Sequence, residues 1–123
     1  PVIMKPQHVR WIEDRHLTGI EHKHLGAFGE YRSGVRLTRI LPGAKIPAHR
    51  QEDAEVCYLV KGSINYAGKT WTGGKTKDEG TYMYIPNGAE AGEISSAEGA
   101  TFFIISLPML AEIEAERSRN KGA

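Results

Sequence analysis

Residues 43–62 read Gly-Ala-Lys-Ile-Pro-Ala-His-Arg-Gln-Glu-Asp-Ala-Glu-Val-Cys-Tyr-Leu-Val-Lys-Gly and decide the fold of this chain. Residues 80–91, Gly-Thr-Tyr-Met-Tyr-Ile-Pro-Asn-Gly-Ala-Glu-Ala, form a second motif of the same kind. Each motif combines a short apolar run with glycines and a proline, which is typical of a strand bounded by turns. The first motif also places His49, Gln51 and Glu55 close together in the chain. It therefore predicts a β-rich domain with a polar site.

Short apolar runs between turn residues extend beyond the two motifs. Several alternate with a period of two, as half-buried strands do. Ala67-Gly68 and Asn87-Gly88 are turn signals between such runs. We expect one compact antiparallel barrel with its core at about residues 19–107. The predicted strands are Gly19–Leu25, Gly34–Leu41, Glu55–Lys61, Ser63–Ala67, Lys69–Thr72, Thr81–Ile85, Ala91–Ile94 and Thr101–Leu107.

One helix is expected after the last strand. Pro108 ends the strand region, and Met109–Asn120 is rich in Ala, Glu and Arg, which favour a helix. Met109, Leu110 and Ile113 share one helical face, and we expect this short apolar stripe to pack on the barrel or on a second subunit. The 123 residues leave room for a single domain, residues 1–123, with neither an internal repeat nor a linker.

Composition excludes several classes of function. The chain has a net charge of +1 with its basic residues scattered, so nucleic-acid binding is not expected. No apolar run approaches the roughly 20 residues that cross a bilayer, and the first residues lack the pattern of a signal peptide. Cys57 is the one cysteine, which rules out an intramolecular disulfide and favours a reducing compartment. We therefore expect a cytoplasmic protein with Cys57 as a small buried hydrophobe.

The polar residues of the first motif have two chemical interpretations. His49 and Gln51 are two apart, so in an extended segment they point to one face, and Glu55 opens the next strand on the face of Cys57. If that face is the barrel interior, the three side chains converge. They would then hold a divalent metal, although an amide oxygen is a weak ligand for the metals that imidazole binds. Alternatively, His49 and Glu55 form a metal-free general acid–base pair, with Glu55 orienting the ring.

Other polar side chains are candidates for binding a substrate. Tyr58, Tyr82 and Tyr84 lie in the strands of the two motifs, and Gln51 offers a hydrogen-bonding amide. Arg39 precedes the Pro-Gly turn and is predicted to hold a substrate carboxylate. Arg36 is a candidate for the same role, and because the two arginines are three residues apart, one faces inward and the other outward. The pair His22-Lys-His24 is expected to be exposed or to form a cap.

The two motifs resemble the paired signatures of the cupin superfamily. Those signatures are Gly, five residues, His-x-His, three residues, Glu, six residues and Gly, and then Gly, five residues, Pro-x-Gly, two residues and His. This chain keeps the glycines, the proline, His49 and Glu55, and has Gln51 and Ala91 at the remaining histidine positions. The resemblance covers Trp11–Leu107. Within the superfamily the chain further resembles the branch that holds ChrR-type cupin domains and the acetylacetone and dihydroxyacetophenone dioxygenases.

The resemblance implies an all-β jelly-roll barrel, also called a double-stranded β-helix, with metal-ligand positions at His49, Gln51, Glu55 and Ala91. Alanine has no donor, so the metal set is incomplete. We expect a single-domain cupin, a homodimer, that acts on a carbonyl-containing or aromatic metabolite as an isomerase, cyclase or lyase. His49 and Glu55 would carry the acid–base chemistry. The alternatives are a metal-dependent dioxygenase with a His/Gln/Glu ligand set and a non-catalytic ligand-binding or sensing barrel.

Overall fold

The fold is almost entirely β. The computed structural model describes residues 3–28, 33–74, 80–108 and 116–119. Its elements in chain order are η1 (Pro6–His8), β1 (Ile12–Glu13), β2 (Ile20–Phe28), β3 (Ser33–Ile40), β4 (Lys45–Ile46), β5 (His49–Arg50), β6 (Ala54–Tyr66), β7 (Lys69–Thr72), β8 (Thr81–Ile85), β9 (Glu90–Ala91), β10 (Ile94–Ser95) and β11 (Ala100–Leu107).

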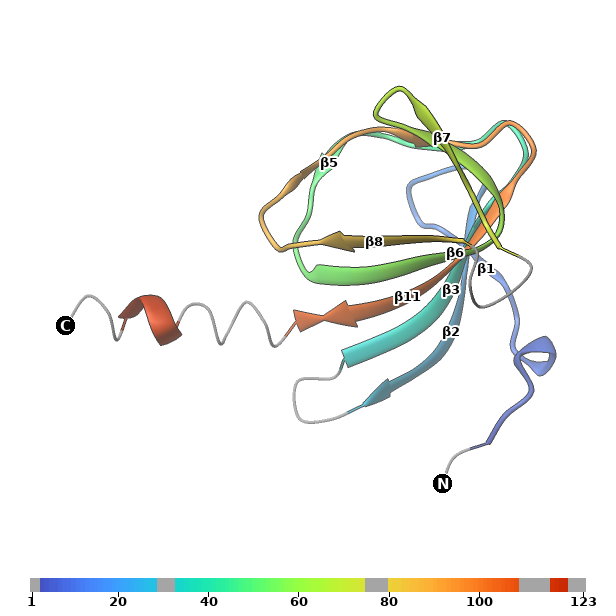
Figure 1. Cartoon of the computed structure of the whole chain (residues 1–123). Coiled ribbons are helices and arrows are strands. Elements are labelled where there is room, and N and C mark those ends of the chain that lie inside the picture. Colours follow the sequence, from blue (N-terminus) through green and yellow to red (C-terminus); the bar gives the residue numbers. More distant parts are fainter. Residues whose placement is uncertain (1–2, 29–32, 75–79, 109–115, 120–123) are drawn as a thin grey trace.

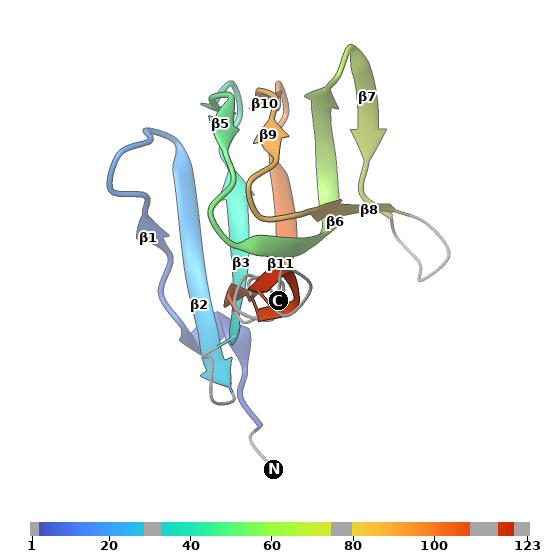
Figure 2. The same cartoon turned by 90° about the vertical axis from the view of Figure 1, so that its left-hand side faces the viewer.

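Most of these strands form one curled antiparallel sheet (Figures 1 and 2). Its order is β1-β2-β3-β11-β6-β10-β4, and β7 and β8 also pair with β6. Strands β5 and β9 make a separate pair in which His49 lies opposite Ala91. Strands far apart in the chain therefore lie side by side, as β3 and β11 do, and the sheet curls around an interior that receives side chains from both motifs.

Strand β6 joins the two parts of the sheet. Its first residues pair with β8 and β11, and its last residues pair with β7. The sequence predicts two strands here, Glu55–Lys61 and Ser63–Ala67, because Gly62 separates them. Gly62 has a φ of +85°, which favours glycine, and a β-bulge lies nearby in the pairing with β11. The glycine bends one long strand instead of ending it.

Alternation along the strands separates an inner from an outer face. On β6, Cys57 and Leu59 are buried on the inner face. Val56 and Tyr58 alternate with them and lie on the outer face, opposite Tyr84 and Tyr82 of β8. The inner face forms the hydrophobic core, which consists of Ile20, Ile40, Cys57, Leu59, Ile64, Ile94, Ala100, Phe102 and Ile104.

The all-β barrel predicted from the sequence is confirmed, and the bounds of β7 and β8 match the predicted ones. The Ala67-Gly68 turn is confirmed as well, because both residues have the positive φ that a tight hairpin needs. The sequence missed β1, β4 and β5, since strands of two residues carry no periodic signal. The predicted strand Ala91–Ile94 is divided between β9 and β10.

Of the predicted helix Met109–Asn120, residues 116–119 are helical, and the rest lies outside the described residues. No described helical segment combines the length and the apolar character that crossing a membrane requires.

Candidate functional site

A cavity of about 170 Å³ lies inside the curled sheet. Its floor is apolar because inward-facing side chains of several strands meet there. Phe102 and Ile104 of β11 and Cys57 of β6 are buried in this floor. The other apolar lining residues are Leu17, Ile20, Ile46, Met83, Ile85 and Ile94. An apolar body of modest size is what such a floor accommodates.

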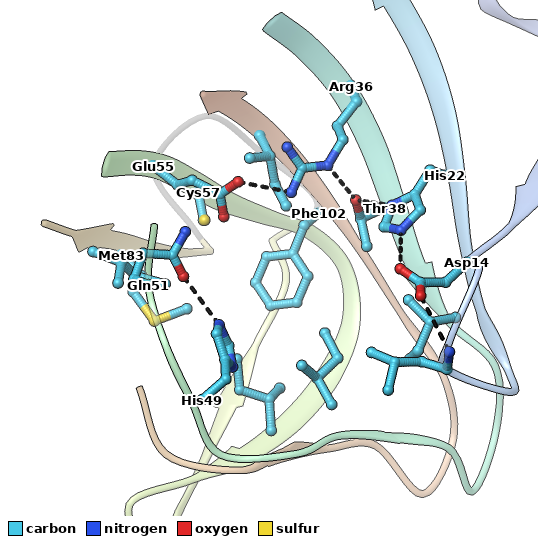
Figure 3. A pocket seen from close by; sticks show the side chains of 16 residues that line it. Asp14, His22, Arg36, Thr38, His49, Gln51, Glu55, Cys57, Met83 and Phe102 are labelled. Atoms are coloured by element: carbon cyan, nitrogen blue, oxygen red, sulfur yellow. Dashed lines mark hydrogen bonds and ion pairs between the residues drawn. The ribbon is translucent and has the colours of Figure 1, made fainter. Parts of the chain in front are cut away.

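Polar side chains gather where the cavity opens. A wider depression on the surface shares Asp14, Arg36, His49, Gln51 and Glu55 with the cavity, and these five residues are the polar collar. In Figure 3, His49 and Gln51 appear on one side of the Phe102 ring, and Asp14 appears on the other. A ligand whose apolar part contacts the floor would present its polar groups to this collar.

His49 and Gln51 form one hydrogen-bonded unit of the collar. His49 Nε2 lies 3.0 Å from Gln51 Oε1, and His49 Nδ1 lies 3.0 Å from the carbonyl oxygen of Pro47. Gln51 is buried, and its Nε2 donates to the carbonyl oxygen of Asp53 at 2.8 Å, which fixes the amide orientation. Both ring nitrogens therefore face oxygen acceptors. A neutral imidazole donates to one of them, and the doubly protonated ring donates to both.

The predicted acid–base pair of His49 and Glu55 is not formed. Glu55 Oε2 instead accepts a hydrogen bond from Arg36 Nη2 at 2.8 Å, while His49 is bonded to Gln51 and Pro47. The reason is register. Arg36 lies level with Ile104 of β11, which in turn lies level with Cys57 of β6. The long arginine side chain therefore crosses β11 on the inner face and reaches the carboxylate.

The metal site predicted at His49, Gln51 and Glu55 does not fit the donors present. The imidazole nitrogen and the amide oxygen face each other in a hydrogen bond, and the carboxylate is paired with a guanidinium group. Ala91, opposite His49, contributes no donor. Within the described residues there is also no group of three His, Cys, Asp or Glu side chains able to hold a metal ion. A transition metal would find a single imidazole here, which is a weak site.

A chain of hydrogen bonds continues from Arg36 to the far side of the collar. Arg36 Nε donates to Thr38 Oγ1 at 3.1 Å, and the same oxygen lies 2.9 Å from His22 Nδ1, with which it shares a hydrogen bond. His22 Nε2 then donates to Asp14 Oδ2 at 2.8 Å. Figure 3 shows this chain crossing the cavity wall from Glu55 to Asp14. The chain thus has four bonds, and a carboxylate closes each end.

Sequence reasoning missed this chain, and it expected His22 to be exposed or to form a cap. A signal was present, because Thr38 and His22 are each two residues from a buried isoleucine and so share the inner face with Ile40 and Ile20. His24 of the same pair is exposed, in agreement with the prediction. What the sequence does not reveal is that the loop after β1 carries Asp14 to the same place.

The carboxylate of Asp14 is held in its charged form. Burial alone would raise its pKa, but hydrogen bonds from His22 and from the backbone N–H groups of His16 and Leu17 outweigh burial, and the pKa lies below its ordinary value of 3.8. The two backbone bonds measure 2.9 and 3.1 Å. Asp14 thus anchors the chain with a negative charge at neutral pH.

The residues predicted to bind a substrate are divided between the two faces. Gln51 is in the collar, but Tyr58, Tyr82 and Tyr84 lie on the outer face, where Tyr82 is 63% and Tyr84 is 44% exposed. Arg39 also points outward, where it bonds to Glu21 at 2.6 Å and covers the Trp11 ring. The inward arginine is Arg36. The sequence predicts that one of the two faces inward without deciding which, and Arg39, the one named for substrate binding, faces outward.

Cys57 lies in the cavity floor and is buried, as predicted. Burial raises the pKa of its thiol to about 12, and the nearby Glu55 carboxylate adds to the effect. A thiol that stays protonated at neutral pH is a poor nucleophile. Cys57 therefore contributes apolar lining to the cavity.

The comparisons agree with this architecture. The family model of the ChrR cupin-like domain matches residues 1–110. A candidate acetylacetone dioxygenase from Methylibium petroleiphilum PM1 is 19% identical with a TM-score of 0.69, over 87% of this chain and 76% of that one. The polyketide cyclase RemF from Streptomyces resistomycificus is 17% identical with a TM-score of 0.67, over 86% and 78% of the two chains.

A chain in the Rhodobacter sphaeroides complex of SigE with the anti-sigma ChrR is 16% identical, with a TM-score of 0.63, over 84% of this chain and 51% of that one. No curated protein matches the sequence. At such identities the solved structures show a shared fold, and their titles span a dioxygenase, a cyclase and an anti-sigma factor.

Proposed function

The chain belongs to the ChrR cupin-like domain family, and on that premise we propose that it is an enzyme that transfers protons on a small carbonyl-containing or aromatic compound. The observation that carries the proposal is the combination of an apolar cavity and a polar collar. A ligand of about the size of one aromatic ring can bury its apolar part in the floor, away from water. Its polar atoms then stay near His49. The retained motif residues thus serve a metal-free reaction.

His49 is the acid–base group of this proposal. It lies at the open end of the cavity, so its ring can meet both a ligand and solvent. When neutral His49 takes a proton from a carbon next to a carbonyl, the C–H electron pair forms a C=C bond and the π pair of the C=O bond moves to the carbonyl oxygen, which gives an enolate. For this step the Nδ1 atom turns from the Pro47 oxygen to the substrate and takes the proton, while Nε2–H donates to Gln51 Oε1, which already faces the ring. Gln51 is therefore a positioning residue for the charged state of His49.

In this proposal, Glu55 has a different role from the one predicted from the sequence. Its carboxylate is bonded to Arg36 and not to His49. It therefore influences the reaction through the arginine, by holding the guanidinium group at the collar. Isomerisation, cyclisation and elimination all begin with proton transfer of this kind, so the proposal covers the three reaction types that the sequence suggested.

Of the two alternatives, the dioxygenase receives less support. A metal-dependent dioxygenase needs a set of donors that His49, Gln51 and Glu55 do not offer in their present hydrogen bonds. A non-catalytic binding or sensing barrel would use the same cavity and collar but would leave the bound compound unchanged. Turnover separates this alternative from the enzyme.

The test is exchange of the methyl protons of acetophenone with D2O, followed by NMR with the purified protein. We expect the protein to accelerate exchange. His49→Ala should lower the rate of catalysed exchange about a hundredfold, as loss of a general base does. His8→Ala is the matched control, because His8 is an exposed histidine on η1, away from the cavity. Equal exchange by the wild type and by His49→Ala would refute the role of His49. Binding without any exchange would favour the sensing barrel.

A further inference from the structure

Arg36 presents a fixed guanidinium group to the cavity. We propose that the cavity selects an uncharged carbonyl compound, and that Arg36 donates a hydrogen bond to its carbonyl oxygen. This proposal names the substrate class of the enzyme proposed above and in that respect rests on the proposed function. Binding measurements alone are enough to test it. Arg36 lines both the cavity and the depression outside it, and its side chain is 21% exposed. It is thus within reach of a ligand that fills the cavity.

The guanidinium group has donors left for a ligand. It carries five N–H bonds. Among the described residues it uses Nε for Thr38 and one Nη2 hydrogen for Glu55. Three N–H bonds of the same rigid plane, two on Nη1 and one on Nη2, therefore have no acceptor from the described part of the protein. A carbonyl oxygen at the collar can accept from this group.

The hydrogen-bonded chain behind Arg36 fixes its orientation. Thr38 is 2% exposed, and its oxygen accepts from Nε, so the plane of the guanidinium group is held from the interior. His22 and Asp14 extend the chain and hold the Thr38 side chain in place. Glu55 holds the opposite end of the group. A donor held in advance loses little entropy on binding, and it stabilises negative charge that develops on the carbonyl oxygen.

The charges around the opening select against anions. The depression is lined by four carboxylates, Asp14, Glu52, Asp53 and Glu55, and by two guanidinium groups, Arg36 and Arg50. The charge of Arg36 is already matched by Glu55 at 2.8 Å. A carboxylate or phosphate ligand would be repelled by this surplus of negative charge, whereas an uncharged carbonyl carries no net charge to be repelled and can accept from Arg36. Arg36 is therefore suited to donate to a neutral oxygen instead of pairing with an anion.

The volume of the cavity further limits which ligands it can hold. Its volume of about 170 Å³ is close to that of an engineered cavity of about 150 Å³ that holds a benzene ring. Isoleucine, phenylalanine and methionine side chains surround that volume. The ligand is accordingly a compound of one ring or of comparable branched size, with its carbonyl directed to the collar.

Benzamide and benzoate test the proposal, because they have the same shape and differ in charge. Their dissociation constants would be measured by protein-observed NMR titration at low salt and neutral pH. We expect benzamide to bind about tenfold more tightly than benzoate or better, a difference of about 1.4 kcal/mol. Equal affinities, or tighter binding of benzoate, would overturn the assignment to uncharged compounds.

Substitution of the two arginines of β3 tests the donor. Arg36→Met keeps an apolar stem and removes the N–H groups, and we expect it to weaken benzamide binding about ten- to hundredfold, as loss of a hydrogen bond to a charged group does. Arg39→Met is the matched control on the outer face and should bind as the wild type does. Unchanged benzamide affinity in Arg36→Met would refute the role of Arg36.

Arg36→Met leaves the Glu55 carboxylate without its partner, which can destabilise the fold. The double variant Arg36→Met/Glu55→Met removes both charges, and its folding is checked by circular dichroism. We expect this double variant to bind benzamide as weakly as Arg36→Met does. Binding as tight as that of the wild type would overturn the proposal. The double variant Glu52→Gln/Asp53→Asn tests the charge argument and should tighten benzoate binding without changing benzamide binding. These titrations need no turnover, so their outcome is independent of the exchange test on acetophenone.

Discussion

At the scale of the residue, the partner of a side chain decides its chemistry. Glu55 occupies a ligand position of the first motif, but its carboxylate bonds to Arg36. His49 keeps its motif position and bonds to Gln51, which replaces a second histidine. A single change of residue type at position 51 thus turns a nitrogen ligand into an oxygen acceptor for the neighbouring imidazole. On the proposed function, this contact positions the imidazole for proton transfer.

Asp14 gives a pH dependence that can be measured. The hydrogen bonds to its carboxylate hold its pKa below 3.8 in the folded protein. The resulting stability is therefore present above about pH 4 and is lost as the pH falls through the folded pKa. We expect Asp14→Asn to lower the free energy of unfolding by about 1–2 kcal/mol at pH 7, because a charged hydrogen bond to His22 is lost. The difference from the wild type should shrink between pH 5 and pH 3.

Urea unfolding at several pH values measures this difference. Glu13→Gln is the matched control, since Glu13 is the adjacent acid and is exposed on β1. It should change the stability little at any of these pH values. A difference between the wild type and Asp14→Asn that stays constant down to pH 3 would show that the charged state of Asp14 does not stabilise the fold.

At the scale of the element, the glycines of the motifs have unequal structural roles. Gly43 and Gly62 have nearly the same positive φ, +84° and +85°. A Cβ atom on Gly43 would meet nothing within 4 Å, whereas one on Gly62 would lie 2.1 Å from the carbonyl oxygen of Gly99. Gly62 thus allows β6 to approach the start of β11. At position 43, glycine is favoured only because the turn has a positive φ.

Gly62→Ala should therefore destabilise the protein by about 3 kcal/mol, because backbone strain and a backbone clash act together. Gly43→Ala adds only the strain and should cost about 1 kcal/mol. Equilibrium unfolding in urea gives both values. Equal effects of the two substitutions would mean that the close approach at Gly62 relaxes without cost, and that the strand can shift past β11.

At the scale of the whole molecule, the curled sheet has two apolar faces. The inner face closes around the cavity. The outer face carries half-buried residues from neighbouring strands, among them Leu37 of β3, Phe103 of β11 and Val56 of β6, together with the exposed Tyr82 and Tyr84. Apolar surfaces of this kind commonly take part in association. The homodimer expected from the sequence stays a prediction, and this face is where we expect the second copy.

Light scattering after size exclusion tests the prediction. We expect about twice the chain mass of 13.6 kDa, and Tyr84→Lys should shift the protein towards the monomer. Ile12→Lys is the control, because Ile12 is 57% exposed but lies level with His22, on the inner side of the sheet. A monomeric mass for the wild type at high micromolar concentration would exclude the dimer.

The sequence by itself determined the architecture. The positions of glycine and proline and the alternation of apolar and polar residues are local properties of the chain. Short stretches of sequence were therefore enough to predict the barrel, its turns and strands such as β7 and β8. The polar residues of the first motif were recognised in the same way. His49 and Gln51 are two apart on a short segment, and their contact is local.

Only the tertiary structure decided the rest of the site. Asp14, Arg36 and Glu55 belong to three distant segments, and the pairing of β2, β3, β11 and β6 brings them to one opening. Which arginine of β3 faces inward depends on the register of that sheet, and a shift of one residue would exchange the two faces. The partners of the collar are thus non-local, and no spacing within the sequence encodes them.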